Sequence, residues 1–132
     1  MKRLIVSFLF IFHLGYSQAQ MGNSIDGWTL DRMGSSVSLS SNGTRLAIGA
    51  IGDFMYNYNP RGRVMIYDWD GSSWSQVGDD INASTGNQFG KSVSLSSNGN
   101  RIAIGAIGVS DYPIAGYVSI YDWDGSSWTQ VG

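Results

Sequence analysis

The chain contains no cysteine and no glutamate, and it has only one histidine and two prolines. Without cysteine there is no disulfide framework. The one histidine, His13, lies near the N-terminus, so the rest of the chain has no imidazole or thiol to act as a base, nucleophile or zinc ligand. A carboxylate pair of the glycosidase kind is conceivable only among the aspartates. We therefore expect no catalytic residue, no metal and no cofactor.

Long hydrophobic runs are absent except at the N-terminus. Two basic residues there precede an apolar run from Leu4 to Leu14, and the small residues Ser17 and Ala19 follow. This order predicts a secretory signal peptide over residues 1–19. The run is too short for a membrane span, which needs roughly 20 apolar residues. We expect an exported protein, secreted or at the cell surface, with no membrane span once the signal has been removed.

Positive charge is scarce in the remaining chain. Removal of Lys2 and Arg3 leaves six basic residues against ten aspartates, a net charge of −4. Nucleic acids and anionic lipid surfaces both select for a basic face. The balance therefore predicts no nucleic-acid partner and no attraction to anionic membranes.

Two stretches of the chain are repeated almost residue for residue. SVSLSSNGTRLAIGAIG at 36–52 returns as SVSLSSNGNRIAIGAIG at 92–108, and GRVMIYDWDGSSWSQVG at 62–78 returns as GYVSIYDWDGSSWTQVG at 116–132. The offsets are 56 and 54 residues. A period of this size is typical of propellers, solenoids and repeat arrays. We divide the chain into the signal peptide (1–19), a first repeat (20–78) and a second repeat (79–132).

Each repeat contains four predicted strands joined by turns. Alternation of apolar and polar residues indicates strands. Asn42-Gly43 and Asp70-Gly71 predict hairpin turns, the first because both residues tolerate positive φ. The predicted strands cover residues 37–39, 45–50, 62–69 and 74–77, and in the second repeat 93–95, 101–106, 116–123 and 128–131.

The third strand of each repeat is apolar on both faces. Val64 and Ile66 point to one side, whereas Met65, Tyr67 and Trp69 point to the other. An isolated sheet would leave one of these faces in water, but a propeller blade is covered on both sides by its neighbours. We therefore predict an all-β fold with two four-stranded antiparallel propeller-type blades, part of an incomplete β-propeller. A sandwich of two sheets is the alternative.

A resemblance to a known repeat supports the propeller. Phe89-Gly90, Asn98-Gly99, the segment 102–106 and the strand 116–121 follow the order of an FG-GAP repeat, and the first repeat has Met33-Gly34 in place of Phe-Gly. The chain thus resembles the FG-GAP repeats of integrin-alpha-type β-propellers, here in a bacterial, exported form with two repeats. The resemblance implies extracellular adhesion or ligand binding.

The aspartates do not form a calcium motif of the kind many FG-GAP repeats carry. The loop between the first two strands, residues 40–44, has no carboxylate, and calcium takes six to eight oxygens, several of them charged. Asp70 and Asp124 each precede a glycine, which predicts a role in starting hairpin turns. Asp68 and Asp122 are expected at a strand edge or bonded to backbone amides.

Four tryptophans recur in the segment W-D-G-S-S-W. Aromatic rings stack on sugars, and some two-blade lectins carry a similar segment and close a propeller by homo-oligomerisation. Those sites also use a glutamate, which this chain lacks. Packing between blades is therefore the favoured interpretation, with sugar stacking as the alternative, for Trp69, Trp74, Trp123 and Trp128.

The two repeats diverge most in the connections 53–61 and 109–115. Loops on a rigid scaffold commonly carry binding residues. We therefore predict ligand contacts at Tyr56, Tyr58, Arg61 and Tyr112, with an extracellular protein or a glycan as the ligand. Tolerant, non-functional connections are an equally weighted alternative.

Two blades do not close a propeller, which uses about four to eight. We expect either a fragment of a longer repeat protein or a chain that assembles with copies of itself.

Overall fold

The computed structural model describes residues 19–52, 61–84, 88–108 and 115–132. The predicted signal peptide, except for Ala19, lies outside these ranges. The described residues contain no helix, and so none that could cross a membrane. They form nine strands: β1 (Met33–Leu39), β2 (Arg45–Ala50), β3 (Arg63–Trp69), β4 (Trp74–Gln76), β5 (Ile81–Asn82), β6 (Ser92–Leu95), β7 (Arg101–Ala106), β8 (Tyr117–Trp123) and β9 (Trp128–Gln130).

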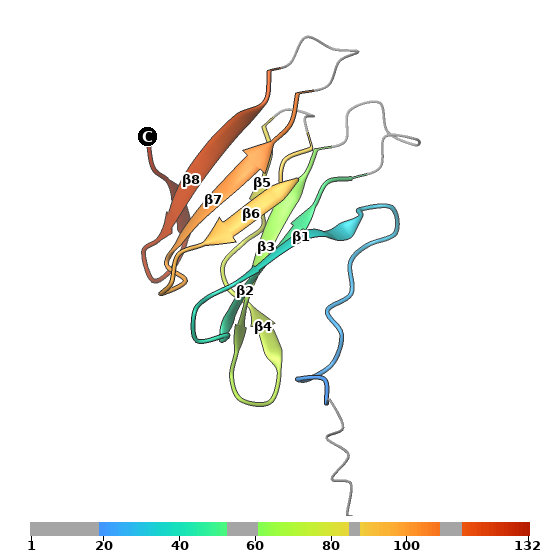
Figure 1. Cartoon of the computed structure of the whole chain (residues 1–132), viewed down its shortest axis with the longest axis vertical. Helices are drawn as coiled ribbons and strands as arrows, with labels where there is room; N and C mark the ends of the chain where they lie inside the picture. The colour runs from blue at the N-terminus through green and yellow to red at the C-terminus, as the bar shows by residue number, and fades with distance from the viewer. Residues whose placement is uncertain (1–18, 53–60, 85–87, 109–114) are drawn as a thin grey trace, which may run out of the picture.

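The strands form two antiparallel sheets, and the four main strands of each sheet come from one repeat (Figure 1). The first sheet has the order β1-β2-β3-β4, with β5 beside β3, and the second has the order β6-β7-β8-β9. The all-β fold and the four main strands of each repeat are thus confirmed. The short strand β5 was not predicted from the sequence.

The hairpins between the first two strands of each repeat are confirmed, but the residues that shape the turns act differently from what was expected. Only the glycines take positive φ, 71° at Gly43 and 74° at Gly99. Asn42 instead uses its side chain, whose Oδ1 accepts hydrogen bonds from the Ser40 hydroxyl (2.7 Å) and the Thr44 amide (3.1 Å). The turn therefore depends on an asparagine side chain that bonds to its own loop.

The strand register divides each sheet into two faces. Because paired residues share a face, the first sheet has a serine face and an opposite aromatic face. The serine face consists of Ser36, Ser38, Arg45, Ala47, Gly49, Val64, Ile66 and Asp68. The aromatic face carries Val37, Leu39, Leu46, Ile48, Met65, Tyr67, Trp69 and Trp74. We call the residue at the same place in the other repeat its counterpart.

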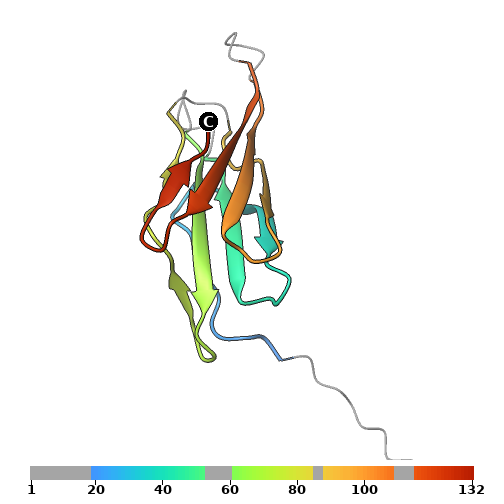
Figure 2. The same cartoon turned by 90° about the vertical axis from the view of Figure 1, so that its left-hand side faces the viewer.

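The core lies where the serine face of the first sheet packs on the aromatic face of the second. Val64 and Ile66 from β3 are fully buried there, together with Ile102 and Ile104 from β7. Phe89, which precedes β6, closes the core. Figure 2 shows the second sheet as a separate layer in front of the first. Two repeats of one sequence therefore contact each other through unlike faces.

Polar contacts at the first strands hold the two sheets in register. The Ser36 hydroxyl donates to the Gly90 carbonyl (2.6 Å), and the Leu95 amide donates to the Ser38 hydroxyl (3.0 Å). Gly49 lies so close to the Gly90 carbonyl that a Cβ there would collide with backbone. Serine and glycine are thus required where the sheets approach most closely.

The N-terminal segment, residues 20–32, runs beside the aromatic face of the first sheet (blue in Figure 1). Trp74 Nε1 donates to the Met21 carbonyl (3.3 Å), and Gly22 lies against the Trp69 ring. The same contacts recur between the sheets, where Trp128 Nε1 donates to the Val77 carbonyl (3.2 Å) and Gly78 lies against Trp123. The segment therefore takes the place on the first sheet that residues 77–78 take on the second.

Candidate functional site

The predicted loop residues lie mainly outside the described residues, as Tyr56, Tyr58 and Tyr112 do. Arg61 is described and is exposed. Strands β2 and β7 end, and β3 and β8 begin, at the same end of the molecule (upper end in Figure 1). Both divergent connections therefore leave from one end of the stacked sheets.

The four tryptophans form two cross-strand pairs. Trp69 and Trp74 have ring centroids 5.4 Å apart and planes inclined at 51°, and Trp123 and Trp128 have the same separation with planes at 45°. Each pair joins the third and fourth strands of its repeat at the turn. The two pairs therefore share one geometry and differ in what covers them.

The second pair lies at the junction between the sheets. The Arg45 guanidinium lies 5.8 and 5.9 Å from the ring centroids of Trp123 and Trp128, within the range of cation–π attraction. Trp128 also packs against the core. This placement favours the structural interpretation for Trp123 and Trp128.

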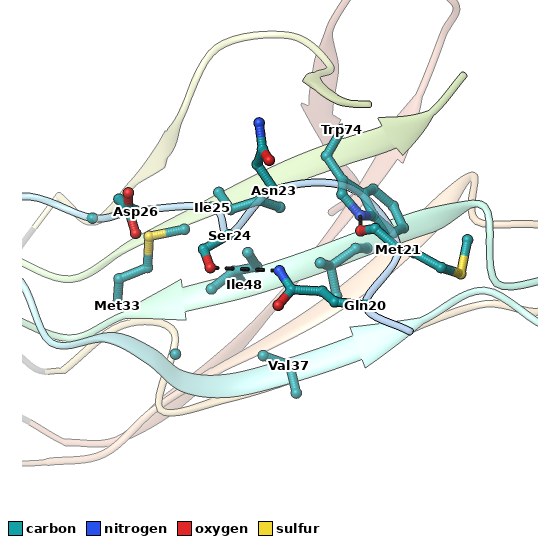
Figure 3. A pocket seen from close by; sticks show the side chains of 13 residues that line it. Gln20, Met21, Asn23, Ser24, Ile25, Asp26, Met33, Val37, Ile48 and Trp74 are labelled. Atoms are coloured by element: carbon teal, nitrogen blue, oxygen red, sulfur yellow. Dashed lines mark hydrogen bonds between the residues drawn. The ribbon is translucent and has the colours of Figure 1, made fainter. Parts of the chain in front are cut away.

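Trp74 of the first pair borders a shallow groove of about 450 Å³ between the N-terminal segment and the first sheet (Figure 3). Its floor is apolar and includes Val37 and Ile48, whereas Asn23 and Asp26 give its wall polar groups. Trp74 stands at one end. The groove is thus the site where an aromatic ring, apolar surface and hydrogen-bonding groups come together.

A charged cluster fixes the N-terminal segment at the other end of β3. Arg63 donates to Asp31 (2.8 Å) and Asp80 (2.6 Å), and its guanidinium stacks 3.6 Å from the ring centroid of Trp28. Burial alone would lower the pKa of Arg63, but the two carboxylates outweigh it and the pKa is raised. Burial likewise would raise the pKa of Asp31, yet the bonds from Arg63 and from the Trp28 and Met33 amides lower it. We call this group of Arg63, Asp31, Asp80 and Trp28 the Arg63 clamp, because its ion pairs hold the N-terminal segment against β3.

Asp68 and Asp122 were expected at a strand edge or bonded to backbone amides, but each pairs with an arginine of the neighbouring strand. Arg45 binds Asp68 through two bonds of 2.6 Å, and Arg101 binds Asp122 through bonds of 2.6 and 2.7 Å. Arg45 also reaches the Gly99 carbonyl (3.2 Å) of the other sheet. The arginine of the first repeat therefore links two sheets.

Asp70 and Asp124 start hairpin turns, as predicted. Asp70 Oδ1 accepts from the Ser72 and Ser73 amides at 2.7 and 2.8 Å, and Asp124 repeats these bonds with Ser126 and Ser127 at 2.8 Å each. The amide bonds from Ser73 and Ser127 are the largest cause that holds the pKa of each carboxyl well below its usual range. Among the described residues, no three acidic or histidine side chains gather to hold a metal ion.

Sequence analysis missed the contribution of the N-terminal segment. Gln20, Gly22 and Ile25 recur 56 residues later as Gln76, Gly78 and Ile81, the offset found for the first pair of repeated stretches. Extension of that comparison toward the N-terminus would have found the signal. The ion pairs gave no signal in the sequence, because partners such as Arg45 and Asp68 are 23 residues apart.

No model of a known protein family matches the chain, and a search of curated proteins also finds no match.

Proposed function

We propose that the protein is a non-catalytic binding module, exported to the cell surface or the medium, whose two sheets are successive blades of an FG-GAP-like β-propeller. The contact between unlike faces is the observation that carries the proposal. Blades around an axis repeat one orientation, so the serine face of one covers the aromatic face of the next. A sandwich related by a two-fold axis would instead bring like faces together.

The position of closest contact also supports successive blades. The second sheet contacts the first mainly through β6, which lies against β1 and β2. Of these, β1 and β6 are the first strands of their repeats and are rich in serine, and β2 contributes Gly49. Blades converge at their inner strands, so small residues suit that position. The chain would then be part of a longer repeat protein or of a closed assembly.

Ligand binding is assigned to the divergent connections at one end of the stack. A rigid scaffold that repeats its strands and varies its loops is suited to recognition. Tyr56, Tyr58, Arg61 and Tyr112 are the residues proposed to contact an extracellular protein or glycan.

Loop replacement tests this assignment. Residues 53–61 and 109–115 are replaced with Gly-Ser segments of equal length, and binding to a glycan array and to immobilised cell-surface glycoproteins is measured. We expect binding to be lost. As a control, Thr44→Ala alters the hairpin at the opposite end and should leave binding intact. Unchanged binding after both loop replacements would reject the loops as the site.

A carbohydrate site at the first tryptophan pair is the second candidate. The groove beside Trp74 favours it, since sugars use an aromatic face together with polar groups such as Asn23 and Asp26. Trp74→Ala should then abolish glycan-array binding, whereas the loop replacements should not. Retained glycan binding in Trp74→Ala would exclude this candidate.

A further inference from the structure

We propose that the second sheet of one molecule docks into the groove on the first sheet of a second copy of the chain. The inference rests on the proposed blade stacking and does not depend on the ligand. The internal junction joins two surfaces of the chain, and the chain has a second copy of each of these surfaces. One half is an exposed serine face, and the other is an unfilled groove.

The exposed half is the serine face of the second sheet. Its residues are identical to those of the first sheet at every position: Ser92, Ser94, Arg101, Ala103, Gly105, Val118, Ile120 and Asp122. Val64 and Ile66 are 0% exposed, whereas their counterparts Val118 and Ile120 are 68% and 40% exposed. The same face is therefore a buried interface in one repeat and open to solvent in the other.

The unfilled half is the groove of Figure 3. The groove is lined by counterparts of the residues that surround Val64 and Ile66 in the core. Six of these residues are Ile25, Met33, Val37, Leu46, Ile48 and Trp74, and they correspond to Ile81, Phe89, Val93, Ile102, Ile104 and Trp128. Because the internal junction fills the equivalent space with a valine and an isoleucine, Val118 and Ile120 of another copy fit the groove by the same chemistry.

The polar part of the junction is duplicated too. Arg45 contacts Gly99 and the tryptophan pair of the next sheet, and its side chain is only 13% exposed. Its counterpart Arg101 is 60% exposed and borders a hollow of about 340 Å³ that includes Asp122. In the docked pair, Arg101 would reach Gly43 and the Trp69–Trp74 pair of the second copy.

Strand pairing extends the interface. Within the chain, β5 adds to the edge of β3 through the pairs Val64–Ile81 and Arg63–Asn82. The matching edge of β8, at Val118 and Tyr117, would receive Ile25 and Asp26 of the second copy. Residues 130–132 of the first copy and residues 20–22 of the second copy would occupy the same place in the interface. The second copy would therefore contribute its N-terminal segment only from Asn23 onward.

Such a contact joins two different surfaces, so it is heterologous. Heterologous contacts generate closed rings or open filaments, whereas two copies that meet through the same face would stop at a dimer. This difference makes the docking mode testable with two variants.

The experiment uses Val118→Lys, which places a charge on the exposed serine face, and Val37→Lys, which places one in the groove. Both side chains are more than half exposed, so neither change should unfold the chain. Ser126→Lys adds the same charge in the β8–β9 turn as a control. Association of the purified protein is followed by sedimentation velocity over a range of concentrations, and folding by circular dichroism.

We expect the unmodified protein and Ser126→Lys to associate, and each of the other variants alone to be monomeric. An equimolar mixture of Val118→Lys and Val37→Lys should form a one-to-one dimer and nothing larger, because each retains one intact half. Monomeric unmodified protein at every concentration would overturn the proposal. So would a mixture that stays monomeric, or association that Val37→Lys does not weaken. Ligand binding is measured separately, so failure of the loop assignment would leave this result standing.

Discussion

Strands β3 and β8 have nearly the same sequence, RVMIYDW and YVSIYDW, but opposite surroundings. In β3 the shared valine and isoleucine form the core, and in β8 they face solvent. The aromatic residues of β8 are instead turned toward the first sheet. Burial in this protein is therefore decided by a residue's place in the stack and not by the residue itself. The sequence of each repeat is suited to neighbours on both sides.

The largest difference should appear when the shared isoleucine is truncated. Ile66→Ala should reduce the free energy of unfolding by about 2–5 kcal/mol, because it opens a cavity between the sheets. Ile120→Ala, at an exposed counterpart, should cost about 1 kcal/mol or less. Urea unfolding at a concentration where the protein is monomeric measures both. Equal losses would mean that the two faces are equally buried.

The paired arginines should differ in the same direction. Arg45→Ala removes bonds to Asp68 and to the second sheet, so we expect a loss of roughly 1–3 kcal/mol. Arg101→Ala breaks only a solvent-screened pair within the second sheet and should leave unfolding almost unchanged. Arg45→Lys keeps the charge but not the two-bond geometry, so its loss of stability should lie between the losses of Arg45→Ala and Arg101→Ala. A larger effect at Arg101 would contradict the assignment of Arg45 as the link between sheets.

Asp31 tests whether the N-terminal segment protects the aromatic face of the first sheet. Its pKa is lowered in the folded state from a usual value near 3.8. The ionised carboxylate therefore stabilises the fold above pH 3.8, and this contribution is lost as the pH falls through the lower folded value. Asp31→Asn should cost about 1 kcal/mol near neutral pH. Its difference from the unmodified protein should shrink below pH 3.8, and a difference that is constant with pH would rule out the ion pair with Arg63.

The turn aspartates should show the smallest difference, because their surroundings are the same in both repeats. Asp70→Ala and Asp124→Ala each remove two amide bonds of equal geometry, so we expect small and matching reductions in stability. Both carboxyls have lowered pKa values, so both contributions should begin to shrink as the pH falls below about 3.8 and be lost only as it passes through the still lower folded values. Thermal unfolding at pH 7 and pH 2 provides the measurement. Unequal effects would show that stacking also acts on the turns.

The strands could be predicted because alternation and turn residues are local signals. The identity of Val64 with Val118 made their difference in exposure unpredictable, since identical segments contain no information about which neighbour is present. The predicted site fared unevenly. The tryptophans were predicted to be structural or sugar-stacking, and contacts of Trp128 with the core favour the former for that pair. The Arg63 clamp could not be predicted, because it joins three segments that are distant in the sequence.

The central claim is that one face is buried in the first repeat and open in the second, and thiol labelling tests it most directly. The chain has no cysteine, so Val64→Cys and Val118→Cys each introduce a single thiol. At a concentration where the protein is monomeric, the thiol at position 118 should react with a maleimide about as fast as a free thiol. The thiol at position 64 should react only when the protein unfolds. Equal labelling rates in the folded protein would contradict the account.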